Sequence, residues 1–259
     1  VYAQSSPGVH QGFEYSRTHN PTRFAYERCI AGLEGGTRGF AFASGLAATS
    51  TLLELFDSGD HIIAMDDVYG GTFRLFERVR RRSAGLDFSW VDLTDPAAFE
   101  AAIRPNTKMV WIETPSNPLL RITDVRSVAA AGRAAGALVV VDNTFLSPAL
   151  QKPIDFGADF VVHSTTKYIN GHSDVVGGAV VARAAEDHAH LTWWANALGI
   201  TGAPFDSFLT LRGLRTLDAR IRVHEENARV IATVLDEHPA VRAVHYPGLP
   251  HHPGHALAR

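Results

Sequence analysis

Short apolar runs alternate with helix-patterned segments along most of the chain. The runs are rich in β-branched residues and end at glycine, proline or polar positions, which is typical of buried strands. They lie at residues 61–65, 87–92, 109–114, 137–142, 160–162 and 177–182. Helical patterns separate several of them, at residues 72–83, 95–103 and 123–135. This alternation predicts an α/β fold in which a mostly parallel sheet is flanked by helices.

The first part of the chain has a different pattern. Residues 1–22 are rich in Ser, Pro, Gly and His without a helical or strand period, so we expect an extended arm. A helix with Thr22 as its N-cap should follow, run to Leu33 and stop at Gly35-Gly36. The predicted main domain then occupies residues 23–215.

The last part predicts the beginning of a smaller C-terminal α/β domain. Residues 216–259 should contribute a linking helix at about 217–237 and a first strand at 241–245, with the remainder of that domain outside the chain. The helix-patterned stretch before it, 184–196, carries Trp193-Trp194, which we expect to pack in the core.

Composition excludes several classes of protein. The formal net charge of −3 gives no reason to expect nucleic acid or an anionic membrane as a partner. No apolar run approaches the ~20 residues of a membrane span. A single cysteine, Cys29, suits a reducing compartment, so we expect a cytoplasmic location. The histidines near the C-terminus do not have zinc-site spacing, and we expect no metal site.

Two predicted strands end on chemically useful groups. One ends on Asp142, and the next is followed within a few residues by Lys167. Parallel strands would bring both to the edge where open α/β sheets bind ligands. Pyridoxal phosphate requires such a pair, because a lysine holds it as a Schiff base and an acid keeps its ring nitrogen protonated. Ser164 and Thr166 could supply hydroxyls to its phosphate.

A glycine turn could complete a phosphate site. The stretch from Gly39 turns through Gly45 into a helix that should last to about Phe56. Free N–H groups of Gly45 and Leu46 at such a helix start would bind an anion. The Gly-x-Gly-x-x-Gly fingerprint is absent from the sequence, which argues against a dinucleotide-dependent oxidoreductase.

Six strings carry a family resemblance. They are SGLAA (44–48), DDVYGGT (66–72), ETPSNP (113–118), VVDNTF (140–145), HSTTKY (163–168) and NGHSDVVGG (170–178). From about Gly12 to its last residue, the chain resembles the pyridoxal-phosphate enzymes of cysteine and methionine metabolism, the cystathionine γ-lyase and γ-synthase group. The resemblance implies the fold-type I pyridoxal-phosphate transferase fold.

The resemblance also implies roles for individual residues. Lys167 would bind the cofactor and move the substrate's protons, with Asp142 as the partner of the ring nitrogen. Tyr69 would stack on the ring and accept a proton from the incoming amino group. Asn117 would bind the substrate carboxylate. The hydroxyls and helix start named above would hold the phosphate.

The family's arm crosses to a neighbouring subunit. By resemblance, Tyr15 and Arg17 would reach the neighbour's cofactor phosphate, and Tyr15 its substrate as well. The resemblance therefore implies a homo-oligomer, typically a tetramer built from dimers, with a small-molecule amino acid as its other partner.

Three functions remain open at the level of sequence. The first is γ-elimination on L-cystathionine, which gives cysteine, 2-oxobutyrate and ammonia. The N-terminal half looks more like the enzymes of this kind. The second is γ-synthase activity, which joins cysteine to an O-acylhomoserine, and the run from Trp193 to Asn196 looks more like those enzymes. The third, from another class, is a cofactor-binding protein without catalysis.

Overall fold

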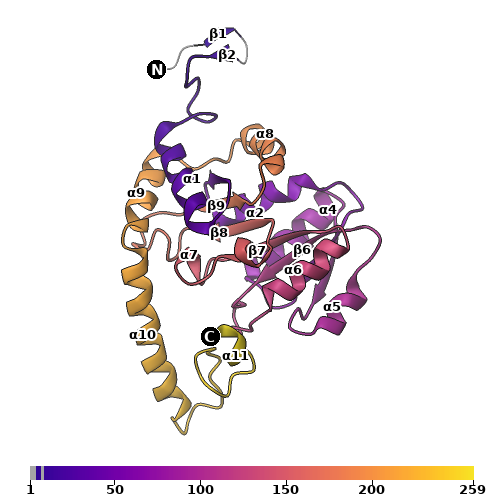
Figure 1. The fold of residues 1–259 in the computed structure, drawn as a ribbon, viewed down its shortest axis with the longest axis vertical. Helices are drawn as coiled ribbons and strands as arrows, with labels where there is room; N and C mark the ends of the chain where they lie inside the picture. The colour runs from indigo at the N-terminus through magenta and orange to yellow at the C-terminus, as the bar shows by residue number, and fades with distance from the viewer. Residues whose placement is uncertain (1–3, 7–8) are drawn as a thin grey trace.

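A seven-stranded sheet forms the centre of the computed structural model, which describes residues 4–6 and 9–259 (Figure 1). Its strand order is β3-β9-β8-β7-β6-β4-β5. The strands are β3 (Arg38–Phe42), β4 (His61–Met65), β5 (Asp87–Val91), β6 (Thr107–Glu113), β7 (Leu138–Asp142), β8 (Phe160–Ser164) and β9 (Gly178–Ala182). All point the same way except β9, which is antiparallel to both neighbours. The prediction of a mostly parallel α/β sheet is confirmed.

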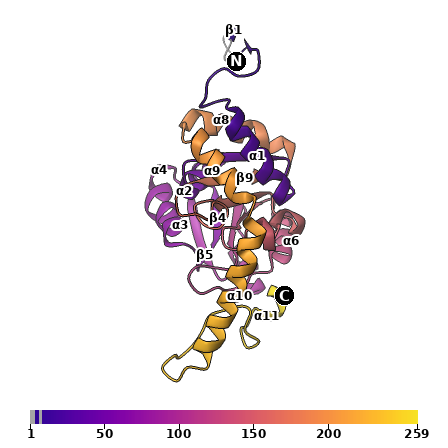
Figure 2. The ribbon, with the colours of Figure 1, turned by 90° about the vertical axis from the view of Figure 1, so that its left-hand side faces the viewer.

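Helices cover both faces of this sheet (Figures 1 and 2). On one face lie α1 (Pro21–Glu34) and α6 (Val125–Ala134). Gly132 of α6 lies so close to the sheet that a β-carbon there would be 3.1 Å from a Val139 methyl group. Strands covered on both faces have no polar side, which explains the apolar runs 109–112 in β6 and 138–141 in β7.

The opposite face is covered by α2 (Gly45–Leu52) and the π-helix η2 (Leu75–Arg80). Phe76 of η2 stacks on Phe88 of β5 with ring centroids 4.9 Å apart. The same ring meets the fully buried Trp111 of β6 edge-on at 5.4 Å. Such aromatic pairs contribute about 0.5–1.5 kcal/mol beyond the burial of their area.

The remaining elements are short or peripheral. They are β1 (Gln4–Ser6), β2 (Val9–His10), η1 (Leu53–Leu55), α3 (Gly70–Arg74), α4 (Arg81–Ser83), α5 (Pro96–Ala102), α7 (Ser147–Leu150), η3 (Pro153–Phe156), η4 (Ala185–Asp187), α8 (His188–Leu198), α9 (Pro204–Leu214), α10 (Leu217–Asp236) and α11 (His255–Ala258). In Figure 1 α10 runs along the left-hand edge of the molecule, and in both views it projects beyond the sheet domain (Figures 1 and 2). Within the described residues, no helix has the length and apolar character needed to cross a bilayer.

The structure corrects several local predictions. The N-cap of α1 is Asn20, not Thr22, because the Asn20 side chain accepts hydrogen bonds from the N–H groups of Thr22 and Arg23. The helix does stop at Gly35, whose φ of 79° is left-handed. Trp193 is 61% exposed and does not pack in the core.

One predicted strand is also absent. Residues 241–245 form no strand, because a strand needs a neighbour for its backbone groups and the described part of the chain offers none there. In the arm, by contrast, β1 and β2 pair as an antiparallel ribbon that stands apart from the sheet (Figure 1). Cross-strand hydrogen bonding produced this ribbon without an apolar period.

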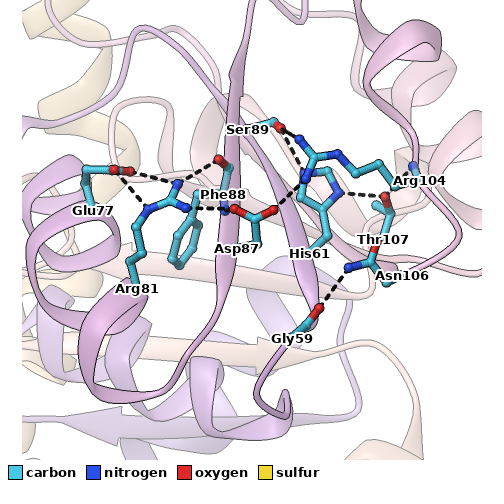
Figure 3. Close-up of polar contacts among 10 residues, drawn as sticks. All are labelled: Gly59, His61, Glu77, Arg81, Asp87, Phe88, Ser89, Arg104, Asn106 and Thr107. Carbon is cyan, nitrogen blue, oxygen red and sulfur yellow. Dashed lines mark hydrogen bonds and ion pairs between the residues drawn. The ribbon is translucent and has the colours of Figure 1, made fainter.

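A buried histidine anchors the edge of the sheet where β4 and β6 begin (Figure 3). His61, the first residue of β4, is fully buried. Its Nδ1 lies 2.8 Å from Thr107 Oγ1, and its Nε2 lies 2.9 Å from Ser89 Oγ. Burial, and then the charge of Arg104, lower the pKa of His61 below its ordinary value. The neutral ring therefore links the first residues of β4 and β6 to Ser89 in the middle of β5.

A group of ion pairs surrounds the first residue of β5 (Figure 3). Asp87 accepts hydrogen bonds from Arg81 Nη1 at 2.7 Å and from Arg104 Nη1 at 2.5 Å. Arg81 also pairs with Glu77 one helical turn earlier, at 2.9 Å. The two arginines hold the pKa of Asp87 below its ordinary range, although burial opposes them. This group joins η2 to the sheet at the edge opposite the candidate site.

Candidate active site

Most of the predicted site residues follow strands at one edge of the sheet. Because β3, β4, β6, β7 and β8 point the same way, their carboxyl ends share that edge. Gly45 follows β3, Tyr69 follows β4, Asn117 follows β6, Asp142 ends β7 and Lys167 follows β8. This is the ligand-binding edge of open α/β sheets. The fold therefore gathers residues that are more than 100 positions apart in sequence.

Lys167 is presented by a tight turn. Its backbone N–H donates to the carbonyl of Ser164 at 3.2 Å, and its carbonyl accepts from the N–H of Gly171 at 2.8 Å. Its side chain is exposed and has no hydrogen-bond partner among residues 4–6 and 9–259. The amine is thus available for covalent and proton-transfer chemistry.

Asp142 and Glu113 form a pair of carboxyl groups next to this turn. They are register partners at the ends of the adjacent parallel strands β7 and β6. Burial first, and then Asp142, raise the pKa of Glu113 to about 9. Burial also raises the pKa of Asp142, although hydrogen bonds from Thr144 and the charge of His163 oppose the shift. Two acids this close do not both ionise readily without a nearby cation.

Thr144 orients Asp142. Asp142 Oδ1 accepts from the backbone N–H of Thr144 at 3.0 Å and from its hydroxyl at 2.5 Å. The same hydroxyl oxygen accepts from the N–H of Ser164 at 2.8 Å. No other donor of the described residues reaches the Asp142 carboxylate, so Oδ2 is left for a further partner.

A second polar pair lies beneath Asp142. His163 and Glu34 are each 0% exposed, and His163 Nε2 lies 2.6 Å from Glu34 Oε1. The same oxygen accepts from Asn143 Nδ2 at 2.9 Å. These residues connect α1 to the ends of β7 and β8. The polar groups at this edge of the sheet are therefore not only the exposed ones of the site but also these buried ones.

Glu113 and Thr144 are site residues that the sequence analysis missed. Glu113 is 4% exposed, and both of its oxygens accept from the backbone N–H of Tyr69, at 3.2 and 3.1 Å. It therefore connects the Tyr69 loop to the carboxyl pair. The sequence did contain a signal for Glu113, namely its position. Like Asp142, it is an acidic residue at the end of a predicted strand and belongs to one of the six strings.

The turn from β3 into α2 contacts the end of β8. A β-carbon on Gly45 would lie 2.8 Å from the β-carbon of Ser164, so only glycine fits at this approach. The sequence analysis explained Gly45 by the approach of a phosphate, whereas here the neighbouring strand occupies that space. The N–H groups of Gly45 and Leu46 have no acceptor among the described residues. They remain donors for an anion beside the Ser164 hydroxyl.

Thr166 has partners of its own. Its Oγ1 donates to the carbonyl of Gly177 at 3.2 Å and lies 3.1 Å from the N–H of the same residue. The hydroxyl thus joins the Lys167 turn to the start of β9. A role toward a phosphate stays a prediction for Thr166, as it does for Ser164.

Tyr69 and Asn117 are placed on the loops after β4 and β6. Tyr69 is 48% exposed at the start of α3. A β-carbon on Gly71 would be 2.3 Å from Tyr69 Cε1, so the phenol ring lies over its own loop. Asn117 is half-buried in the turn after β6. Their roles toward ring and substrate stay predictions.

Tyr15 and Arg17 are not brought to Lys167 within this chain. Arg17 Nη1 donates to the carbonyl oxygen of Asn196 at 2.6 Å and to its Oδ1 at 2.8 Å, near the end of α8. The Arg17 guanidinium lies 5.2 Å from the centre of the Tyr15 ring, which is 56% exposed. Both residues are therefore located on the arm side of the molecule.

Three potential metal ligands lie together on the same arm. The ligand atoms of His10, Glu14 and His19 are within 4.8 Å of one another. Two of them already have partners, since Glu14 accepts from Gln4 at 2.7 Å and His10 Nδ1 accepts from the N–H of Gly12 at 3.2 Å. Contacts within the arm account for their proximity.

Comparisons with known proteins identify the family. The sequence model of the Cys/Met metabolism PLP-dependent enzymes matches residues 1–259. The chain belongs to this family. It is a pyridoxal-phosphate-dependent enzyme, and the alternative of a cofactor-binding protein without catalysis is not supported.

Several members of this PLP-dependent family resemble the chain closely. Cystathionine beta-lyase of Coxiella burnetii is 56% identical over 100% of this chain and 67% of the relative. Cystathionine gamma-lyase of Bacillus subtilis is 49% identical over 100% of this chain and 68% of the relative. A crystal structure of cystathionine gamma synthase from Xanthomonas oryzae pv. oryzae, in complex with aminoacrylate and cysteine, is 56% identical with a TM-score of 0.95. It is matched over 99% of this chain and 66% of its own, so the chain spans about two thirds of these relatives.

The residues of this family member fit pyridoxal phosphate. No lysine or arginine of the described residues forms an ion pair with the buried carboxyl groups, and Asp142 keeps one oxygen for a donor, which a protonated ring nitrogen would supply. Two unused N–H groups at the start of α2 lie beside a serine hydroxyl, which suits a phosphate. The Lys167 amine has no competing partner in the part of the chain that the structure describes. The donor set therefore matches the aldehyde, the ring nitrogen and the phosphate of the cofactor.

The raised pKa of Glu113 predicts a pH-dependent stability of the cofactor-free protein. Between about pH 4.5 and pH 9 the folded chain holds a proton on Glu113 that the unfolded chain has lost. The free energy of unfolding should therefore fall as pH rises through this window, by up to about 1.4 kcal/mol per pH unit. In Glu113→Gln, urea unfolding between pH 6 and pH 8.5 should show a visibly flatter dependence. Glu100→Gln, an exposed site on α5, is the control, and equal slopes in all three proteins would contradict the assignment.

Proposed function

We propose that the chain is the cofactor-binding part of an enzyme that removes the γ-substituent of L-cystathionine, giving cysteine, 2-oxobutyrate and ammonia. The observation that carries the proposal is the placement of Lys167 and Asp142 after adjacent parallel strands, β8 and β7. The cystathionine gamma-lyase of Bacillus subtilis supports the choice of reaction.

The chemistry divides among a few side chains. Bound pyridoxal phosphate supplies an electron sink for negative charge that develops on the amino-acid substrate. The Lys167 amine takes the α-proton and, on its unrestrained side chain, can also move protons at the β-carbon. Asp142, oriented by Thr144, holds a negative charge opposite the ring nitrogen. We assign Tyr69 to the ring face and Asn117 to the substrate carboxylate.

Specific relatives favour two other reactions on the same scaffold. The Xanthomonas oryzae pv. oryzae structure is of a gamma synthase, which supports γ-replacement of an O-acylhomoserine by cysteine as the second candidate. The Coxiella burnetii relative supports β-elimination from cystathionine as the third. All three reactions use a lysine base and a cationic ring, so the groups described above serve each of them.

Product analysis separates the three reactions. The purified full-length protein is incubated with L-cystathionine, and separately with O-succinylhomoserine plus cysteine. Cysteine and 2-oxobutyrate from cystathionine are expected for the proposed γ-elimination. Homocysteine and pyruvate would establish β-elimination, and turnover of the second pair alone would establish the synthase. Either result would overturn the lyase proposal.

We also propose the assembly and location of the enzyme. Tyr15 and Arg17 would serve the site of a neighbouring subunit in a homotetramer built from dimers, which is consistent with their absence from the Lys167 turn of their own chain. Residues 1–22, 23–215 and 216–259 would be the arm, the cofactor domain and the start of a C-terminal domain. The single free cysteine, Cys29, supports a cytoplasmic location.

A further inference from the structure

The turn that presents Lys167 is bound by an arginine from a distant helix. Arg220, on the first turn of α10, donates from Nη1 to the carbonyl oxygen of Tyr168 at 2.6 Å. Its Nη2 donates to the carbonyl oxygen of Gly213 at 2.8 Å. One guanidinium therefore joins the residue after Lys167 to the end of α9. Its Nε is also engaged, with Thr216 Oγ1 at 3.1 Å.

Two glycines make room for this contact. A β-carbon on Gly171, whose φ is +73°, would lie 1.9 Å from Arg220 Nη1. A β-carbon on Gly213 would lie 2.2 Å from the carbonyl oxygen of Asn170. The turn after Lys167 and the end of α9 are thus in close contact, and Arg220 occupies the space between them. A side chain at either glycine would therefore displace the guanidinium or the turn.

The contact is costly for a charged group. Arg220 is half-buried, and burial lowers its pKa. None of the ion pairs formed by residues 4–6 and 9–259 includes it, so only neutral oxygens compensate the lost water. Arg222, two residues later, is the opposite case, because its side chain is 72% exposed and pairs with Asp218 at 3.1 Å. A half-buried cation without an anion is unfavourable for stability alone.

A second contact joins the same helix to the same turn. The ring of Tyr168 lies 5.6 Å from the ring of His224, one turn after Arg220 on α10. The backbone of Tyr168 and its side chain are therefore both held by α10. Among the residues that the structure describes, none contacts the side chain of Lys167, one residue earlier, through a hydrogen bond or ion pair that would fix its direction otherwise.

We propose that Arg220 is a positioning residue for Lys167: it fixes the turn that aims the lysine amine and couples that turn to α10. The inference rests on the proposed role of Lys167 as the cofactor-binding base. Loss of the guanidinium leaves the fold in place but lets the turn of residues 165–171 shift, which misaligns the amine. A displacement of about 1 Å can lower a rate by about 10²-fold.

The test compares Arg220→Met, Arg220→Lys and the control Arg222→Met in the full-length holoenzyme. Arg220→Met should lower kcat about 10- to 100-fold with KM changed less than about threefold. It should also shift the pH midpoint of the visible absorption of the lysine-bound cofactor by at least about half a unit, because the surroundings of the amine change. Arg220→Lys should be intermediate, since one ammonium cannot span both carbonyls. Arg222→Met should match the wild type in both measurements.

Hydrogen exchange on the cofactor-free protein gives an independent result. The backbone amides of residues 165–171 should exchange faster in Arg220→Met than in the wild type. In Arg222→Met their exchange rates should equal those of the wild type. A folded Arg220→Met with wild-type kcat and midpoint would overturn the inference, as would a lowered Tm with unchanged kcat at a permissive temperature. Where Arg220→Met does not fold, Arg220→Lys is read against the same criteria. If the wild-type enzyme, incubated with the cofactor, shows no absorption of a lysine-bound cofactor, the proposed function itself would be overturned.

Discussion

Replacing Lys167 by alanine is expected to lower turnover by at least about 10³-fold and to abolish covalent attachment of the cofactor. A positioned general base alone contributes about 10²–10⁴-fold, and in the proposed function this lysine also provides the covalent attachment. Its exposed amine has no partner among the described residues, so no neighbouring group restrains or replaces it. The measurements are steady-state turnover of cystathionine, and the mass of the protein after borohydride reduction.

Lys152→Ala is the matched control for this experiment. Lys152 is an exposed lysine that precedes η3, outside the site. Its variant should keep wild-type turnover and the mass increase of one cofactor per chain. Near-normal turnover in Lys167→Ala, or loss of the mass increase in Lys152→Ala, would assign the chemistry to a different amine.

The second largest effect is expected for Asp142→Asn, which should lower kcat/KM about 10²–10⁴-fold. The asparagine keeps the shape and the oxygen that accepts from Thr144, but it removes the negative charge opposite the ring nitrogen. Breaking a buried charge pair costs about 3–5 kcal/mol, and about 1.4 kcal/mol corresponds to a factor of ten. Cofactor can still be held by Lys167 and the phosphate donors, so its content should fall less than the rate does.

Asp57→Asn, an exposed position before β4, serves as the control for this charge change. Cofactor content from absorbance and kcat/KM are measured on the same samples. A loss of only a few-fold in fully loaded Asp142→Asn would show that another group, such as its register partner Glu113, carries the charge.

Most strands of the sheet were predictable because they contain a short buried apolar run, as β4, β7 and β8 do. The expected strand at 61–65 coincides with β4, and those at 87–92 and 137–142 differ from β5 and β7 by one residue. The order of strands was not predictable, and neither was the reversed direction of β9. Pairing depends on contacts between residues far apart, such as Val181 of β9 with Gly39 of β3, which leave no local signal.

Local errors had the same origin. The 241–245 run has strand composition, but a strand exists only where a neighbour completes its hydrogen bonds. Trp193 is a large aromatic residue of the kind that usually packs in a core, yet it lies on the outer side of α8. In the site, Glu113 and Arg220 were overlooked because their importance comes from a register partner and from carbonyl groups about 50 residues away.

By itself, the sequence determined the class of fold and the family, and it predicted Lys167 and Asp142 as the reactive pair. These follow from local periodicity and from short strings, in which chemistry depends on residue type at fixed spacing. Only the tertiary structure decided that Glu113 shares its charge environment with Asp142, that Thr144 orients this pair, and that Arg220 holds the lysine turn. Burial and long-range contacts set the pKa of a carboxyl group and the direction of an amine, and neither exists before the strands and α10 come together.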